Sequence, residues 1–485
     1  MKPIDTKADI RLEQDSLGWV EVDSAALWGS QTQRALDNFS ISGIPIGRFG
    51  TLIVALAMIK MAAARTNCRL GRLSPEKCRA IEVVCAELIA GQHVSAFPID
   101  VIQGGAGTSV NMNVNEVIAN IANEREGFVL GSYAFIHPND DVNCSQSTND
   151  VYPSAVKLSL LLASGGLHAA LAGLADSFAE KAGAFADVVK LGRTQLQDAV
   201  PMTLGQEFGA FAATVRKDIA ALDDVLRDLH ELNLGGTAIG TGLNAPEGYS
   251  EAVIAELATI AGMRFVRAGD LIEANWDMGA FVSLSGVLKR IASKLSKIAN
   301  DLRLLSSGPR GGLGEIVLPE AQPGSSIMPG KVNPVIPEVV NQVCFQVFGN
   351  DVAITAAAEA GQLQLNAMEP LIAFNLHVSL LLLERATTTL DGLCVQGIAA
   401  DAARCRSHLD ASVVTATALT PLIGYTKSAE LARTALRMSR TVRDLAIEQQ
   451  VLDVETAHLL DPLALARPQG TAPHKKSPTR QDVQT

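Results

Sequence analysis

The sequence predicts a mainly α-helical globular protein, and three observations support that fold class. The 485-residue chain is 48% hydrophobic and 19% charged, which suits a soluble protein with an ample buried core. Aromatic residues make up only 4%, while Ala and Leu are abundant, which favours closely packed helices over sheets rich in aromatic and β-branched residues. Long apolar patterns of helical period, separated by short Gly, Pro or Asn breaks, fill most of residues 151–400.

Charge and cysteine content narrow the class of protein further. The net charge of −11 argues against a nucleic-acid or anionic-membrane partner. The seven cysteines are scattered, with no C-x-x-C pair, which favours reduced thiols in a cytoplasm over disulfides or a metal site. Residues 1–15 lack the apolar stretch of a secretory signal, and the apolar run 158–175 contains His168 and glycines. We expect a cytoplasmic protein that does not cross a membrane.

Helical patterns follow one another along the chain. The first covers residues 51–67, and the second runs to residue 91 from Ser74 as N-cap and Pro75 at the first helical position. Further patterns cover residues 151–188, 203–232, 250–262, 274–306, 335–361 and 363–398. Thirty residues of helix span roughly 45 Å, and helices of that length that are apolar on most faces also bury surface against other subunits. We therefore expect a homo-oligomer.

Polar segments lead into two of the predicted helices. Residues 104–116 form a glycine-rich turn that runs into an Asn-rich helix start, where backbone N–H groups and the hydroxyl of Thr108 suit an anionic group. A simple N-cap with polar turns explains the same segment. Ten of the fourteen residues 137–150 are Asn, Asp, Ser, Thr or Gln, which is more hydrogen-bonding capacity than a cap requires. Ser147, Thr148 and Asn149 lie where the dipole of the next helix favours a carboxylate.

Two further polar segments, residues 192–203 and 235–244, interrupt the helical patterns. Each combines hydroxyl and amide side chains with glycines, and the first contains Thr194 and Gln195. A simple connection between two helices is the alternative explanation for either segment. Together with the segments above, they provide several neutral groups able to form hydrogen bonds.

The most distinctive segment is the irregular loop at residues 324–334, which reads GSSIMPGKVNP. Two Gly and two Pro in eleven residues exclude a regular helix or strand, yet the loop carries Ser325, Ser326, Lys331 and Asn333. A solvated linker has a similar composition. Apolar helical patterns on both sides favour a functional site held between packed elements.

The residues of these segments resemble the aspartase/fumarase superfamily from about residue 11 to about residue 455. The segments that carry the resemblance are GTSVNMNVNEVIAN, HPNDDVNCSQSTND, GRTQLQDAVPMTLGQEF, GGTAIGTGLN and GSSIMPGKVNP. Within the superfamily they look most like the aspartate ammonia-lyases, with the class II fumarases next. The last of the five segments is specific for the superfamily but is shared by both groups.

The resemblance implies a mainly α fold of three domains, whose long central helical bundle assembles into the core of a homotetramer with active sites shared between subunits. The expected boundaries are an N-terminal domain at 1–146, the central bundle at 147–402 and a small C-terminal helical domain at 403–466. We expect residues 467–485, which have no periodicity, to be a disordered tail.

The resemblance also implies a chemistry, the reversible deamination of L-aspartate to fumarate and ammonia through an aci-carboxylate. Ser325 would be the general base. Lys331 and Asn333 would bind the carboxylate next to the amino group, and Thr108, Ser147, Thr148 and Ser326 would bind the other. Asn149, Thr194 and Gln195 would lie near the leaving group. The family chemistry requires no cofactor, although some members are activated by a divalent metal; no metal-ligating residue is expected here.

One residue favours ammonia over water as the group that leaves. Class II fumarases resemble this sequence but carry His where Gln195 stands, and an amide cannot act as the base that activates water. Ammonia is already a neutral nucleophile, so an amide suffices to position it. Against this choice, residues 419–432 look more fumarase-like. The alternatives are a class II fumarate hydratase that interconverts fumarate and L-malate, or a related lyase that adds another amine to fumarate.

Overall fold

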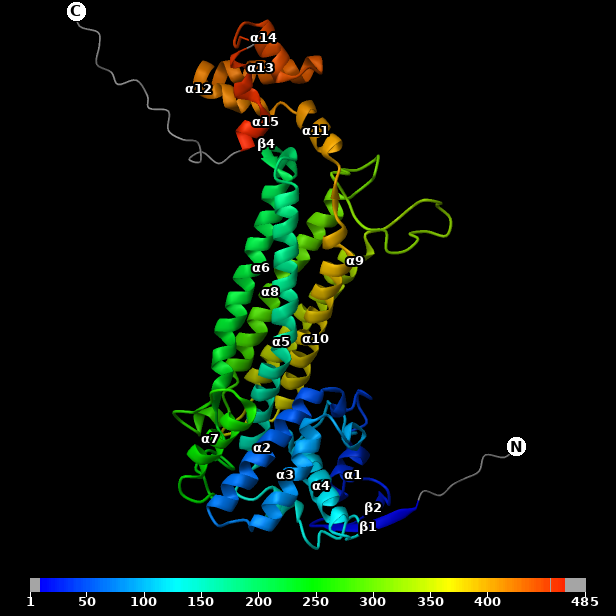
Figure 1. The fold of residues 1–485 in the computed structure, drawn as a ribbon, viewed down its shortest axis with the longest axis vertical. Coiled ribbons are helices and arrows are strands. Elements are labelled where there is room, and N and C mark those ends of the chain that lie inside the picture. The colour runs from blue at the N-terminus through cyan, green and yellow to red at the C-terminus, as the bar shows by residue number, and fades with distance from the viewer. Residues whose placement is uncertain (1–8, 454, 467–485) are drawn as a thin grey trace, which may run out of the picture. The chain divides into compact units, whose positions relative to one another are not determined.

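The computed structural model describes residues 9–453 and 455–466, which form two compact units built from separate stretches of the chain. Unit 1 contains the described residues up to Leu171, with Lys217–Leu295 and Gln342–Thr387. Unit 2 contains Ala172–Arg216, Ser296–Asn341 and the described residues from Thr388 onward. Figure 1 shows that helices dominate, which confirms the predicted mainly α fold.

The three-domain division stays a prediction, since the two units do not test boundaries at 146 and 402. The predicted tail, residues 467–485, lies outside the described residues.

Unit 1 begins with a small hairpin that precedes a capped helix. Strands β1 (Ile10–Asp15) and β2 (Gly18–Asp23) pair antiparallel, and α1 (Ser30–Asn38) follows. The carboxylate of Glu116 accepts hydrogen bonds from the backbone N–H groups of Gly29, Gln31 and Thr32. An anion at a helix start satisfies N–H groups that lack partners within the helix, so Glu116 fixes α1.

Three helices make the body of the N-terminal part of unit 1: α2 (Gly50–Arg69), α3 (Pro75–Ile89) and α4 (Thr108–Arg125). The hydroxyl of Ser74 accepts a hydrogen bond from the Lys77 N–H at 3.3 Å, which confirms the predicted N-cap of α3. Most of the apolar stretch of α2 is buried inside the unit. Although α2 and α5 (Thr148–Ala184) are both long and apolar enough to cross a membrane, core helices of globular proteins pass the same test.

The long helices follow the predicted order, with ends that differ by a few residues. They are α5, α6 (Leu204–Leu226), α7 (Tyr249–Ala261), α8 (Gly279–Leu305), α9 (Val335–Glu359) and α10 (Glu369–Leu393). The last of them starts six residues later than expected, because Gln362 pairs with Leu365 in a short bridge.

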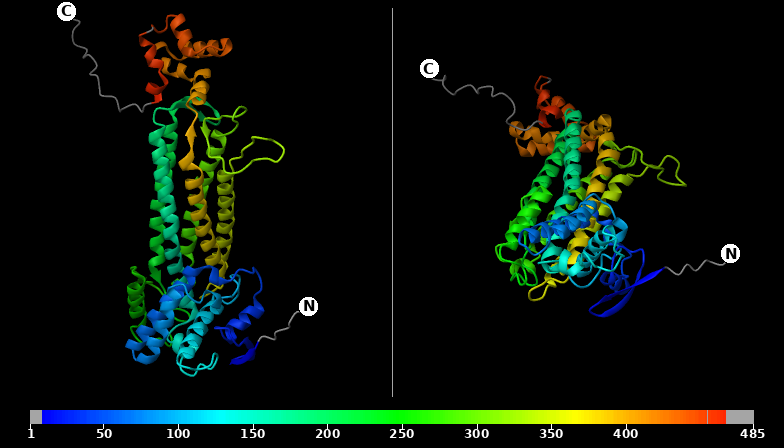
Figure 2. Two further views of the ribbon diagram at one scale, coloured as in Figure 1. Left: turned by 45° about the vertical axis from the view of Figure 1, so that its right-hand side comes forward. Right: turned by 60° about the horizontal axis from the view of Figure 1, so that its bottom comes forward.

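Stretches of these long helices run side by side within each unit (Figure 2). In unit 1, the Ser159 hydroxyl bonds to His377, which ties α5 to α10. In the same unit, the Ser285 hydroxyl bonds to Asp351, which ties α8 to α9. In unit 2, the rings of Phe178 and Phe208 pack edge to face between α5 and α6.

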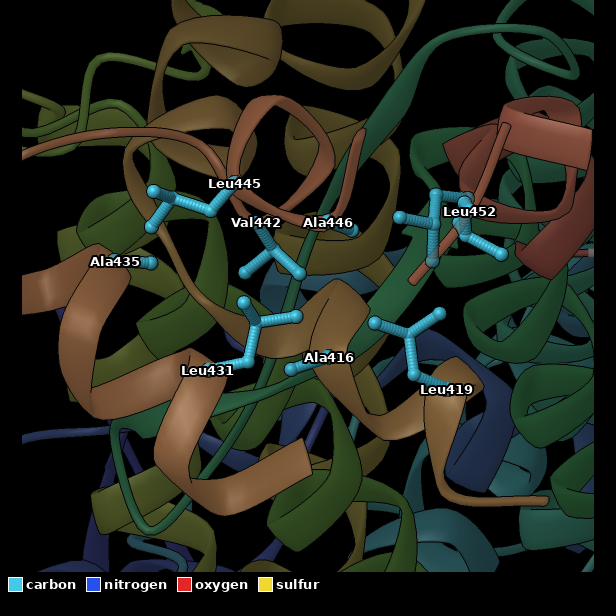
Figure 3. Close-up of a cluster of buried hydrophobic side chains, with 9 residues drawn as sticks. Ala416, Leu419, Leu431, Ala435, Val442, Leu445, Ala446 and Leu452 are labelled. Carbon is cyan, nitrogen blue, oxygen red and sulfur yellow. The ribbon is translucent and has the colours of Figure 1, made fainter. Parts of the chain in front are cut away.

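Unit 2 combines a hairpin with a cluster of short helices. Strands β3 (Val189–Thr194) and β4 (Gln197–Thr203) pair antiparallel. The C-terminal helices are α11 (Ala402–Ala411), α12 (Thr420–Ile423), α13 (Tyr425–Met438), α14 (Val442–Glu448) and α15 (Pro462–Ala466). Figure 3 shows an apolar core to which α13 and α14 contribute, and in which Leu419, Leu431 and Leu445 lie together. Burying each such side chain contributes about 1.5–3 kcal/mol.

The remaining elements are short. Strands β5 (Glu231–Leu232) and β6 (Val266–Arg267) pair parallel, and β7 (Ile316–Val317) and β8 (Ala399–Ala400) pair antiparallel. A π-helix covers η3 (Pro138–Val142), and 3₁₀ turns cover η1 (Ile46–Arg48), η2 (Val94–Ala96), η4 (Arg227–His230), η5 (Glu273–Asn275), η6 (Val395–Gly397), η7 (Val414–Leu419) and η8 (Thr456–Leu460).

Candidate active site

The N-terminus of α4 is the first place where the structure collects predicted site residues. Gly107 caps this helix with a φ of +82°, and a Cβ at Gly107 would lie 2.4 Å from the ring of Tyr152, so only glycine fits. The tight turn lets the start of α4 approach α5. Thr108, the first residue of α4, is exposed, so its hydroxyl and the positive end of the helix dipole face solvent.

The N-terminus of α5 lies beside that of α4. The Asn111 amide in the first turn of α4 donates a hydrogen bond to the Thr148 hydroxyl at 3.1 Å. Ser147 is the N-cap: its hydroxyl accepts from the Asn149 N–H at 3.3 Å, while its own N–H donates to Asp150 at 2.9 Å. This reciprocal pattern resembles a capping box, with Asp in the third helical position and the Ser147 hydroxyl bonded to the second helical N–H. Two helix starts therefore meet and favour an anion between them.

Asp150 connects a third predicted segment, residues 235–244, to the N-terminus of α5. Its buried carboxylate accepts hydrogen bonds from the Gly235 N–H at 2.9 Å and the Thr237 N–H at 3.1 Å. Burial raises the pKa of Asp150 to about 6, while its three N–H donors oppose the rise. The Asn149 amide donates to the Ala238 carbonyl at 2.8 Å. Thr108, Ser147, Thr148 and Asn149 thus form one group in unit 1, supported by residues 235–238.

The hairpin of unit 2 carries the next pair of predicted residues. Its two-residue turn consists of Gln195 and Leu196, whose φ angles are +53° and +61°. Non-glycine residues seldom adopt this left-handed conformation, although the primed turn it creates matches the twist of a hairpin. Thr194 and Gln195 are exposed at the tip. Strain held at an exposed polar tip is typical of a functional site.

A buried charge cluster anchors the base of this hairpin. The carboxylate of Glu315, which has no exposure to solvent, lies 2.7 Å from Arg193, 3.1 Å from Lys190 and 3.0 Å from His408. Burial alone would raise the pKa of Glu315, but the bond to Arg193 and the charge of Lys190 outweigh it and hold that pKa below its ordinary value. Sequence reasoning missed this cluster.

The loop at residues 324–333 is closed at its neck by its own backbone. The Gly324 N–H donates to the Lys331 carbonyl at 2.8 Å, and the Asn333 amide donates to the Gly324 carbonyl at 3.0 Å. A Cβ on Gly324 would lie 2.5 Å from the Lys331 carbonyl oxygen, so the neck requires glycine there. In this arrangement the side-chain amide of Asn333 closes the loop.

Within the loop, the Ser325 hydroxyl oxygen accepts hydrogen bonds from the Ile327 and Met328 N–H groups, each at 3.2 Å. Two backbone donors on one oxygen stabilise negative charge there, which a serine base requires. Ser326 and Lys331 are exposed. Among the described residues of unit 2, no hydrogen bond or ion pair joins Ser325, Ser326, Lys331 or Asn333 to Thr194 or Gln195.

The sequence and the fold together define the class of protein. The lyase family model matches residues 18–349, and the model of the fumarase C C-terminus matches residues 416–467. The chain belongs to the aspartase/fumarase superfamily of lyases.

Within that superfamily, this chain is similar to proteins named aspartate ammonia-lyase. That from Pseudomonas fluorescens is 57% identical over 92% of this chain and 94% of the relative, and that from Escherichia coli K12 is 47% identical over 92% and 93%. A solved structure described as a fumarate lyase:delta crystallin from Brucella melitensis bound to cobalt has a TM-score of 0.93 and 56% identity, and covers 95% of this chain and 100% of that one. The class II fumarase from Schistosoma mansoni has a TM-score of 0.91 and 36% identity, with coverage of 95% and 100%.

Proposed function

We propose that this protein catalyses the reversible deamination of L-aspartate to fumarate and ammonia. Relatives that share about half of its residues over nearly its whole length are named for that reaction. The observation that carries the chemistry is the Ser325 oxygen, which accepts two backbone N–H groups inside a loop that also contains Lys331. These donors support an alkoxide, which removes a proton from the carbon next to one substrate carboxylate.

The hydroxyl groups of unit 1 suit the intermediate that this step creates. When the proton moves to Ser325, the electron pair passes into the neighbouring carboxylate, which becomes a doubly charged aci-carboxylate. Collapse of that group breaks the carbon–nitrogen bond and releases ammonia. The hydroxyl oxygens of Ser147 and Thr148 already accept N–H groups from the protein, so their own protons are free to be donated to the carboxylate. Donors oriented in advance lower the barrier.

The other roles keep the sequence-based assignment. Thr108 and Ser326 add donors to the aci-carboxylate, and Lys331 pairs with the carboxylate next to the amino group. Asn149, Thr194 and Gln195 surround the amine. The Asn333 amide uses one of its two N–H groups on the Gly324 carbonyl, which leaves the other N–H for the substrate.

We also propose that the site is completed by other copies of the chain in a homotetramer. The loop of Ser325 and the hairpin of Gln195 share no direct bond within unit 2, and each exposes polar residues. On α9, Phe345 and Val352 are 59% and 68% exposed, and their seven-residue spacing puts them on one face. Such a face fits a second copy of the same helix. Light scattering that finds a monomer would reject this assembly.

Cofactor and compartment remain proposals. We propose a soluble cytoplasmic enzyme with no nucleic-acid partner, in which no cofactor is required and a divalent metal acts at most as an activator. The described residues contain no cluster of three or more His, Cys, Asp or Glu arranged to hold a metal. Turnover measured after dialysis against EDTA, with and without added Mg²⁺ or Co²⁺, tests the proposal; activity that requires the metal would contradict it.

The deciding experiment compares two substrates. Purified protein is given L-aspartate or L-malate, and fumarate is followed by its ultraviolet absorbance. Fast formation of fumarate from aspartate, together with slow formation of fumarate from malate, supports the proposal. The reverse pattern supports the alternative, a class II fumarate hydratase, which the similarity to a fumarase structure keeps in view. Turnover of fumarate with a larger amine and not with ammonia supports a related amine lyase.

A further inference from the structure

Lys60 is a buried cation that the proposed reaction does not use. It lies in α2 with no exposure to solvent, and its ammonium donates to the amide oxygens of Asn143 and Gln146, each at 3.0 Å. Among the described residues it has no carboxylate within ion-pair distance. Burial lowers its pKa to about 7, although the charge of Asp150 opposes the shift. Burying an ammonium away from water costs free energy, so we ask what this lysine does at this position.

The ammonium and nearby backbone carbonyls together orient the two amides: the Asn143 NH₂ donates to the Gln146 carbonyl at 3.3 Å, and the Gln146 NH₂ donates to the Val142 carbonyl at 2.9 Å. An ammonium only donates hydrogen bonds, so both Asn143 and Gln146 must turn their oxygens toward Lys60. The Asn143 oxygen also accepts from the amides of Asn111 and Asn115, each at 3.2 Å. Asn111 must therefore present its NH₂ group on this side.

The orientation of the Asn111 amide in turn fixes the bond that it makes to Thr148, a predicted substrate-binding residue. Its NH₂ group has two hydrogens: one goes to Asn143, and the other goes to the Thr148 oxygen at 3.1 Å. Thr148 accepts that bond, and among the described residues no acceptor binds its own proton. Asn111 with its amide reversed would instead draw the Thr148 proton inward. All of these residues belong to unit 1, so the relay lies within one compact body.

We propose that Lys60 and Asn111 are positioning residues that direct the Thr148 hydroxyl proton outward, toward the substrate carboxylate that becomes the aci-carboxylate. The inference rests on the proposed function, which places that carboxylate at Thr148. It adds residues that never touch the substrate. Their effect is to fix one donor before the reaction, so that the donor needs no reorganisation when the second negative charge develops.

A double-mutant cycle tests the relay. Asn111→Ala should lower kcat/KM for aspartate about ten-fold, since a hydrogen bond to a charged group loses its orientation. In a Thr148→Val background the same change should have little further effect, because the hydroxyl that it orients is gone. Effects of the two substitutions that simply multiply would overturn the proposal.

The control is Asn113→Ala, which removes another buried amide of α4, one that donates to the Ala96 carbonyl at 3.0 Å and has no path to Thr148. It should lower the melting temperature without changing kcat/KM. An equal loss of kcat/KM in both Asn→Ala variants would show a merely structural role for Asn111.

Lys60→Met extends the test to the cation. In folded protein, checked by circular dichroism and gel filtration, it should lower kcat/KM in the wild-type background and not in the Thr148→Val background. If this variant does not fold, the Asn111 cycle alone decides. If the wild-type protein turns over malate and not aspartate, the proposed function is rejected but the relay is not. The same double-mutant cycle run with malate then tests the relay, because malate carries the same carboxylate that becomes the aci-carboxylate.

Discussion

Arg193 lies 2.7 Å from the fully buried carboxylate of Glu315, so the residue that precedes Thr194 is tied to the interior of unit 2. His408 of α11 binds the same carboxylate at 3.0 Å. The exposed turn at Gln195 is thereby connected to a rigid base, and a rigid base is what a residue needs if it is to position an amine accurately.

Glu315→Gln should weaken both the fold and the handling of ammonia. Breaking the buried pair between Arg193 and Glu315 costs about 3–5 kcal/mol, while Lys190 keeps its other partner, Glu207, at 2.6 Å. We expect a lower melting temperature and a higher KM for ammonia when fumarate is aminated. Asp410→Asn is the matched control, because Asp410 pairs with Arg406 on the surface, where a pair contributes about 0–1 kcal/mol. Equal effects of the two substitutions would contradict an anchoring role.

Ser325→Ala should remove nearly all turnover. Loss of a general base costs about 10²–10⁴-fold in kcat. The side chain is half-buried in a loop and contributes no core packing, so the elution volume in gel filtration and the melting temperature should be unchanged. Initial rates with aspartate and gel filtration give the two readouts. Substantial remaining activity in intact protein would show that another group removes the proton.

Lys331→Met should act mainly on substrate binding. A charge-assisted hydrogen bond to a carboxylate contributes about 1.5–3 kcal/mol, so the KM for aspartate should rise about ten- to a hundred-fold. Lys297→Met is the control, since Lys297 is exposed and pairs with Asp301 in the same helix. A KM that stays at the wild-type value would exclude Lys331 from the carboxylate site.

Stability should depend on pH through Lys60. Its folded-state pKa of about 7 lies below its ordinary value of 10.5, so the unfolded chain binds the extra proton between these values. Stability from this group is therefore present above pH 10.5 and lost as the pH falls through about 7. The melting temperature of the wild type, relative to Lys60→Met, should rise between pH 7 and pH 9.5. A constant difference would show that Lys60 is not strongly perturbed.

Local patterns predicted much of the fold. The cap at Ser74, the polar start of α5 and the order of the long helices all follow from residues close together in sequence. The capping role of Asp150 could also have been predicted from the sequence, since Asp150 stands three residues after Ser147. The quoted motifs also contain Asn111, although nothing in one sequence distinguishes it from the neighbouring asparagines.

Contacts between distant residues were not predictable in this way. Glu315 meets Arg193 and His408 across roughly a hundred residues on each side, and no spacing rule connects them. The turn at Gln195 and Leu196 has positive φ angles without the Asn-Gly or Gly signal that announces such turns. From the sequence, Gly324 and Gly330 suit hinges for closure of the loop. This stays a prediction, and the close approach at Gly324 gives that glycine a second reason to be present.

Because the neck of the 324–333 loop is closed, two properties of the serine base can be altered separately: how often the loop closes, and how readily the Ser325 hydroxyl ionises. The N–H donors of Ser325 belong to its own turn, and the neck bonds hold that turn together. If the loop swings over a substrate, Ser325 and its donors travel as one body. Both donors then stay with the hydroxyl in the open and closed positions, while the groups that it faces change. Substitutions at the neck should alter how often the loop closes, while Ile327→Pro or Met328→Pro, each of which removes one backbone N–H donor, should alter how readily the hydroxyl ionises.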